Sequence, residues 1–259
     1  MHPFPATYYW TMSHILTSTQ GAVLTISFNR PEKMNAVTRD MYAALTSALE
    51  EAAGDFAIRA VIIRSEGDHF TAGNDISDFM NNPPTAEDSA VARFLAALLN
   101  FPKPLIASIK GNAVGVGTTM LLHCDLVFAH PTTSLSMPFV SLGLVPEAGS
   151  TYLFPQLVGH QRAAKVWFTG EAFTAEEARE MGLVTDIAED MDALAMKYAE
   201  KIALQPPQAV INTKALMKAR LHDSVAAVMR AEFEIFSMAL QSEEAAEAFM
   251  NFMSKRSKL

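Results

Sequence analysis

The chain has 259 residues and a mass of 28.2 kDa, with half of its residues hydrophobic and 19% charged. Its formal charge of −8 and isoelectric point near 5.4 argue against a nucleic-acid partner, because phosphate contacts require a basic surface. No apolar run is long enough to span a membrane, so the composition predicts a soluble globular protein with one large core and no membrane partner. The single cysteine, Cys124, excludes an intrachain disulfide and favours a structural thiol in a reducing compartment.

The first 170 residues alternate between apolar runs typical of strands and segments of helical periodicity. Residues 1–20 lack the basic and apolar regions of a secretory signal, and we expect them to form a loose N-terminal arm. We expect strands at Ala22–Phe28, Ala60–Arg64, Leu105–Ile109 and Asp125–His130, and helices at Arg39–Ala53, at Val91–Leu99 and from Thr118 onward. This alternation favours an α/β core over residues 21–170, with parallel strands joined by right-handed crossovers.

Helical patterns dominate after Pro146, so residues 171–259 are expected to form a helical C-terminal region. The expected helices are Ala163–Phe168, Thr174–Met181, Met191–Leu204, Val210–Leu221, Ser224–Leu240 and Glu243–Met253. Met and Phe on one face of the helix at 224–240 predict packing on the chain's own core or on another subunit. The final Ser-Lys-Leu matches the peroxisomal address, so we expect a peroxisomal location for a eukaryotic source and a cytoplasmic one, which we favour, for a bacterial source.

A turn with three glycines, Gly111, Gly115 and Gly117, follows the strand at 105–109. It predicts a tight entry into a buried helix, whose unpaired N–H groups and dipole would attract an anion or oxyanion. The glycine spacing differs from the dinucleotide fingerprint and lacks the lysine of a Walker loop. The chain also shows no nucleophile elbow of a Ser-His-Asp triad and no zinc-binding histidine pair. A purely structural turn that packs a helix on a strand is the alternative.

A second glycine-containing loop, His69–Asp75, could aim one backbone N–H at the same point and so complete an oxyanion hole. Asn29–Ala36, His69–Asp75, and Gly111–Gly117 followed by Cys124-Asp125 closely resemble the three signatures of the enoyl-CoA hydratase/isomerase, or crotonase, superfamily. The resemblance covers nearly the whole chain after the first twenty residues. It is strongest to the delta-3, delta-2-enoyl-CoA isomerases.

The resemblance implies a crotonase-like spiral of ββα units with a helical C-terminal trimerisation region, and hence a homotrimer or hexamer. It also implies an acyl-CoA thioester substrate, no metal and no cofactor besides the CoA of the substrate. The thioester oxygen would be held by the N–H groups of Ala72 and Val116, where position 116 is usually glycine in the family. Motif position further implies a set of substrate-binding residues: Lys33, Asn35, Ala36, Thr71, Gly73, Asn74, Asp75, Ile76, Gly115, Thr119 and Phe139.

Hydration of a 2-enoyl-CoA needs two carboxylates acting on one water. The hydratase positions for these groups hold Thr119 and Phe139 here, and neither side chain is a general base at neutral pH. Pro146-Glu147 instead resembles the isomerase site, whose single catalytic glutamate falls at this position. We expect Glu147 to carry a proton from C2 to C4 of a 3-enoyl-CoA, with apolar Met137 and Phe139 raising its pKa.

Two alternatives stay open. One is a hydratase or another crotonase-type activity that uses an acid not yet placed. The other is a non-catalytic acyl-CoA-binding protein, in which Glu147 lies in the first turn of a helix and only complements the helix dipole.

Overall fold

Six strands form the central sheet, in the order β1-β2-β3-β4-β6-β9. β1 is antiparallel to β2, and all other neighbours are parallel. The strands span Ile15–Gln20 (β1), Val23–Phe28 (β2), Ala60–Ser65 (β3), Leu105–Ile109 (β4), Leu126–Ala129 (β6) and Asp186–Ile187 (β9). The prediction of an α/β fold with a mainly parallel sheet is therefore confirmed.

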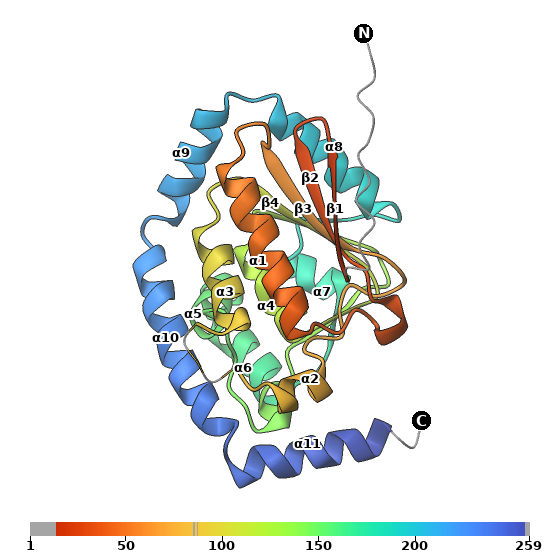
Figure 1. Ribbon diagram of the computed structural model, residues 1–259, viewed down its shortest axis with the longest axis vertical. Helices are drawn as coiled ribbons and strands as arrows, with labels where there is room; N and C mark the ends of the chain where they lie inside the picture. The colour runs from red at the N-terminus through yellow and green to blue at the C-terminus, as the bar shows by residue number, and fades with distance from the viewer. Residues whose placement is uncertain (1–13, 85, 87, 257–259) are drawn as a thin grey trace.

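The computed structural model (Figure 1) describes residues 14–84, 86 and 88–256. It contains a second, smaller sheet of three strands. This sheet contains β5 (Asn112–Val114), β7 (Ser134–Ser136) and β8 (Phe173–Thr174). β5 and β7 run parallel, and β8 is antiparallel to β7. Because β5 begins three residues after β4 ends, the small sheet continues from the carboxyl end of the central one.

Both faces of the inner strands β2, β3, β4 and β6 are largely buried, which explains why these strands are mainly apolar, whereas the edge strand β1 is exposed over most of its length. Successive residues of β3 point to opposite sides, so Val61 and Ile63 belong to the main core while Ala60 and Ile62 belong to a smaller one. α1 and α3 pack on the main-core side, and α8 covers the other face. One strand thus connects two apolar layers.

Each helix expected from periodicity is present, with its ends moved by no more than three residues. The α-helices of the described chain span Arg39–Gly54 (α1), Ile76–Asn81 (α2), Ala90–Asn100 (α3), Val116–Thr119 (α4), Ser150–Val158 (α5), His160–Thr169 (α6), Ala175–Glu180 (α7), Met191–Ala203 (α8), Pro207–Lys218 (α9), His222–Ala239 (α10) and Glu243–Arg256 (α11). Thr174 and Glu177 form a capping box at the start of α7.

The last three helices, α9 to α11, run along the outside of the molecule and form its left side and lower edge in Figure 1. α9 is anchored by the buried Lys214, whose Nζ donates to Asp125 Oδ2 and to the carbonyl oxygen of Lys103, both at 2.6 Å. Phe236 of α10 and Phe249 of α11 belong to the main core. The C-terminal helices are therefore part of the same packed unit as the sheets.

The structure corrects three expectations about organisation. Ile15–Gln20, expected in the loose arm, forms β1 in the sheet, while residues 1–13 lie outside the described part of the chain. The boundary near Gly170 does not separate two parts, because β8, β9 and α8 complete the sheets and the second core. The buried helix begins at Val116 rather than Thr118, and β5 occupies part of the expected turn.

Two negative findings hold for the described residues. None of their helices is both long and apolar enough to cross a bilayer. No cluster of three or more His, Cys, Asp or Glu side chains within them is arranged to hold a metal ion. Cys124 is a free, half-buried thiol. The final Ser-Lys-Leu lies outside the described residues.

Candidate active site

The glycine turn after β5 creates one unpaired backbone donor. Gly115 has φ +57° and ψ −117°, a conformation that side chains disfavour, and it places Val116 at the first position of α4. The Gly115 N–H donates to the carbonyl oxygen of Ser136 at 2.9 Å. The Val116 N–H points out of the first helical turn and has no partner among the described residues. It is therefore free to donate to an anion.

The loop at 70–75 lies directly beside β5. The Thr71 N–H donates to the carbonyl oxygen of Asn112, and the Val114 N–H donates to that of Thr71, both at 3.0 Å. Gly73 has φ +82°, and a Cβ built on it would lie 2.9 Å from the carbonyl oxygen of Val114. Only glycine therefore permits this approach. The parallel bridge between Thr71 and Ala113 places this loop alongside β5.

The free donor of this loop is not the one expected. The Ala72 N–H already donates to the carbonyl oxygen of Met34 at 2.9 Å, which contradicts its assignment to the oxyanion hole. The Val37 N–H donates to the Gly73 carbonyl oxygen, and the Asp75 N–H donates to the Val37 carbonyl oxygen. The Asn74 N–H, between these two bonds, has no partner among the described residues. Sequence position alone did not reveal which amide the neighbouring loop would occupy.

Asn35 joins the loop at 30–36 to the segment at 66–71. It is fully buried, and its Nδ2 donates to the carbonyl oxygens of Glu66 and His69, while its Oδ1 accepts from the Arg30 N–H. The Thr71 hydroxyl donates to the Asn35 carbonyl oxygen at 2.7 Å. Asn35 and Thr71 thus fix the backbone of the site from inside, and their side chains do not face a ligand.

The other predicted contacts in these loops lie around Arg30. Its Nη1 donates to the Ala36 carbonyl oxygen at 2.9 Å and forms an ion pair with Asp75 at 2.6 Å. Asp75 also caps α2, whose first residue is Ile76. Lys33 is exposed at the end of a 3-10 helix, η1 (Pro31–Lys33). Lys33, Ala36, Asp75 and Ile76 do not line the pocket beside Glu147 that is described below.

Glu147 lies in the loop before α5, not in the first turn of a helix. Its Oε1 accepts a hydrogen bond from the Thr119 hydroxyl at 2.5 Å, and its Oε2 has no hydrogen-bond partner among the described residues. Burial raises the pKa of Glu147 from the usual 4.5 to about 7; the Thr119 hydrogen bond opposes the rise, and the nearby Glu232 charge adds to it. The carboxyl group is therefore poised to exchange a proton near neutral pH.

Glu147 lines a pocket of about 330 Å³ between α3 and α10, called here the acyl pocket. Most of its lining is apolar, and the polar residues are few. The lining residues are Tyr42, Asn74, Phe79, Pro84, Val91, Ala92, Leu95, Ala96, Leu99, Asn100, Glu147, Ala148, Ala226, Met229, Arg230, Phe233, Glu234 and Phe236. Of the predicted site residues, Asn74 and Glu147 line it.

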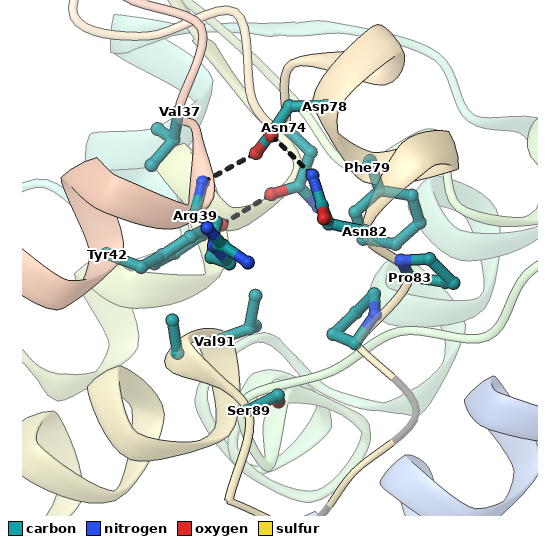
Figure 2. Close-up of a pocket in the computed structure, with 12 residues that line it drawn as sticks. Val37, Arg39, Tyr42, Asn74, Asp78, Phe79, Asn82, Pro83, Ser89 and Val91 are labelled. Atoms are coloured by element: carbon teal, nitrogen blue, oxygen red, sulfur yellow. Dashed lines mark hydrogen bonds between the residues drawn. The ribbon is translucent and has the colours of Figure 1, made fainter.

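A neighbouring pocket of about 230 Å³ shares part of this wall. Figure 2 shows Tyr42 and Asn74 joined across it, where the Tyr42 hydroxyl donates to Asn74 Oδ1 at 2.5 Å. Asp78 accepts from the Arg39 N–H at 2.6 Å in the same view. Burial, followed by the charge of Glu147, raises the pKa of Tyr42 well above its usual value, so the phenol stays a donor. Tyr42 therefore orients Asn74.

Phe139, at the second hydratase position, is a packing residue. It is buried, contacts Trp167 with ring centroids 6.3 Å apart, and lies 3.9 Å from where a Cβ on Gly115 would stand. It does not line the acyl pocket. Its ring supports the turn that presents Val116 and places no acid there.

Sequence reasoning missed two residues of the site. Tyr42 falls within the apolar stripe of α1, where a tyrosine is most simply read as core. Glu232 of α10 reaches the loop of Glu147 from far along the chain, and nothing in the local pattern of α10 indicates this contact. Both were hidden because their roles come from tertiary packing.

The profile of the enoyl-CoA hydratase/isomerase family matches residues 18–258. The chain belongs to the enoyl-CoA hydratase/isomerase family. It is 34% identical over 254 residues to enoyl-CoA delta isomerase 2 of Homo sapiens, covering 95% of this chain and 64% of the human protein. It is 31% identical to 2,3-dehydroadipyl-CoA hydratase of Escherichia coli, covering 95% of this chain and 97% of that enzyme. The expected superfamily is thus confirmed.

Solved structures of the enoyl-CoA hydratase/isomerase family confirm the fold. OdaA of Pseudomonas aeruginosa matches with a TM-score of 0.91 and 44% identity, covering 93% of this chain and 98% of OdaA. An enoyl-CoA hydratase/isomerase of Pseudoalteromonas atlantica matches with a TM-score of 0.90 and 40% identity, covering 94% and 98%. Because relatives carry the names of isomerases and of hydratases, the site must decide the reaction.

Proposed function

We propose that the protein is an acyl-CoA isomerase that shifts the double bond of a 3-enoyl-CoA to the 2 position. The observation that carries this proposal is Glu147, a buried residue of the acyl pocket lining whose Oε1 is held by Thr119 and whose Oε2 has no hydrogen-bond partner among the described residues. A single carboxylate with a pKa near 7 can both remove and return a proton. The chain spans 64% of the length of human and rat enoyl-CoA delta isomerase 2. The activity is therefore proposed for this chain from its own site.

The reaction would proceed through a thioester enolate. Glu147 Oε2 takes a proton from C2, the electrons of that C–H bond move onto the thioester oxygen, and the N–H groups of Asn74 and Val116 donate to that oxygen. The same carboxyl then returns the proton to C4, while the C2–C3 double bond forms and the C3–C4 double bond is lost. Removing one donor of an oxyanion hole typically costs about 2.7–4 kcal/mol of barrier, so two donors make the weakly acidic C2–H accessible to a carboxylate.

A hydratase mechanism has less support from these residues. Thr119 occupies the position of the first hydratase carboxylate, and its hydroxyl donates to Glu147. Phe139 occupies the second position and is packed in the core. The only other carboxylate among the residues that line the acyl pocket is Glu234, which is exposed. The buried part of the pocket thus offers one base and no second acid for water.

The decisive experiment compares wild type with Glu147→Gln on 3-hexenoyl-CoA. We expect the variant to lose turnover by orders of magnitude while still binding a CoA thioester, because glutamine keeps the shape but cannot accept a proton at C2. Unreduced turnover would refute the proposal. Crotonyl-CoA serves as the second substrate, and loss of its conjugated thioester absorbance would favour a hydratase.

Exchange of the C2 proton separates an enzyme from a binding protein. In heavy water, NMR should show deuterium entering C2 of a bound acyl-CoA in wild type and not in Glu147→Gln. Tight binding without exchange in wild type would indicate a non-catalytic acyl-CoA-binding protein.

We also propose self-association as a trimer or a pair of trimers. The outer helices carry large exposed apolar side chains, including Leu216 and Met217 of α9 and Met238 of α10. Such residues are typical of a covered surface. Sedimentation at micromolar concentration should show an oligomer, and a monomer would count against this part of the proposal.

A further inference from the structure

The segment that follows Glu147 has an unusual backbone. Ala148 and Gly149 are consecutive residues with φ +67° and φ +68°, in the left-handed region. Ala148 is buried, and a non-glycine residue there is held only when its surroundings enforce the conformation. The direction of Glu147 therefore depends on whatever holds this turn, called here the 148–149 turn.

Glu232 of α10 holds one side of the 148–149 turn. Its Oε2 accepts from the Gly149 N–H at 2.6 Å, and its Oε1 accepts from the Thr151 N–H at 2.9 Å and the Thr151 hydroxyl at 2.6 Å. Glu232 is 5% exposed. Because Gly149 is the N-cap of α5 and has no side chain, Glu232 supplies the cap from another helix.

His123 holds the other side. It is the last residue of the 3-10 helix Met120–His123 (η2), which continues directly from α4, and its Nε2 lies 2.7 Å from the carbonyl oxygen of Ala148. Since a carbonyl oxygen only accepts, Nε2 carries the hydrogen. Burial lowers the pKa of His123 to about 4, so the ring is neutral and remains a donor through the neutral range. The 148–149 turn is thus held by hydrogen bonds from Glu232 of α10 and from His123 of η2.

α10 has a second role in the same place. Val225 and Met229 pack against Gly149, where an added Cβ would lie 2.6 Å from Val225 Cγ1 and 3.3 Å from Met229 Cγ. Met229 also lines the acyl pocket. The helix that forms a wall for the acyl chain is therefore the helix that fixes the 148–149 turn.

We propose that Glu232 is a positioning residue, which from α10 fixes the 148–149 turn and so keeps the carboxyl group of Glu147 in place at the wall of the acyl pocket. The inference rests on the proposed role of Glu147. Glu232 touches no reacting atom, since its two oxygens are occupied by Gly149 and Thr151. Its loss should impair the chemical step rather than binding, because a misplacement of about 1 Å can cost about a hundredfold in rate.

Glu232 also sets the charge around Glu147. The other titratable or charged groups near this carboxyl are Tyr42 of α1, neutral His123 of η2, and Arg230 and Glu234 of α10. Of the charged groups, Glu232 is the one that raises the pKa of Glu147. A neutral residue at 232 should therefore let Glu147 ionise at lower pH.

The test uses Glu232→Gln in the full chain, with Asp223→Asn as an exposed control on the same helix. We expect Glu232→Gln to lower kcat on 3-hexenoyl-CoA by about 10- to 100-fold, with KM within about threefold of wild type, and to move the acidic limb of the pH–rate profile to lower pH. Glu232→Asp, which keeps the charge, should leave that limb in place. Asp223→Asn should match wild type.

A merely structural role would lower the melting temperature and leave kcat and the acidic limb unchanged well below melting, and that result would overturn the proposal. If Glu232→Gln fails to fold, Thr151→Val decides the matter, because it removes only one of the three bonds to Glu232. A several-fold fall in kcat at constant KM supports positioning, and an unchanged kcat refutes it. Turnover retained by Glu147→Gln would instead refute the proposed function, so the two failures are distinguishable.

Discussion

Replacing Glu147 by glutamine should make the folded state more stable at high pH while it abolishes turnover. Burial raises the pKa of Glu147 from 4.5 to about 7. Between these values the folded state binds more protons than the unfolded state, so the stability from this group falls as pH rises. At about 1.36 kcal/mol per pKa unit, the ionised carboxylate costs the folded state about 3 kcal/mol above pH 7.

Urea unfolding of wild type and Glu147→Gln at about pH 5 and about pH 8 measures this cost. The wild type should lose about 2–3 kcal/mol more than the variant between these two pH values, because only the wild type must ionise a buried group. Glu50→Gln, at an exposed position of α1, is the matched control and should follow the wild type. A constant difference between wild type and Glu147→Gln at both pH values would refute the reasoning that Glu147 is buried with a raised pKa.

Three further predictions concern the site. The wild-type kcat/KM on a 3-enoyl-CoA should rise with pH through about 7, because the base must be ionised, and a rate independent of pH from about 5 to 8 would contradict this. Thr119→Val removes the hydrogen bond that lowers the pKa of Glu147, so turnover at pH 7 should fall about 5- to 50-fold and recover near pH 9; an unmoved acidic limb would exclude this role. Gly73→Ala should destabilise the fold by about 1–3 kcal/mol and lower kcat, measured by thermal unfolding and assay, whereas Gly54→Ala, which has open space, should change neither.

The sequence by itself determined the elements and the family. Strand runs such as Leu105–Ile109, in which Ser108 is the single polar residue, are mainly apolar because both faces of this strand are buried, and this pattern is visible without coordinates. Thr38 and Thr174 cap α1 and α7 through their own side chains, and such caps involve only residues close together in the sequence. The motif around Pro146-Glu147 also singled out the acid that the structure places in the acyl pocket. Local chemistry and spacing suffice for such features.

Only the tertiary structure decided which backbone donor is free and which side chain holds the turn after Glu147. Ala72 and Asn74 lie two residues apart in one loop, and their difference comes from the Met34 carbonyl oxygen of a neighbouring loop, which occupies the Ala72 N–H. Glu232 likewise reaches the 148–149 turn across more than eighty residues of chain. Hydrogen-bond partners distant in sequence leave no periodic or local signal, because they depend on how separate elements pack. The position of Glu147 was therefore predictable from the sequence, and the contacts that surround its carboxyl group were not.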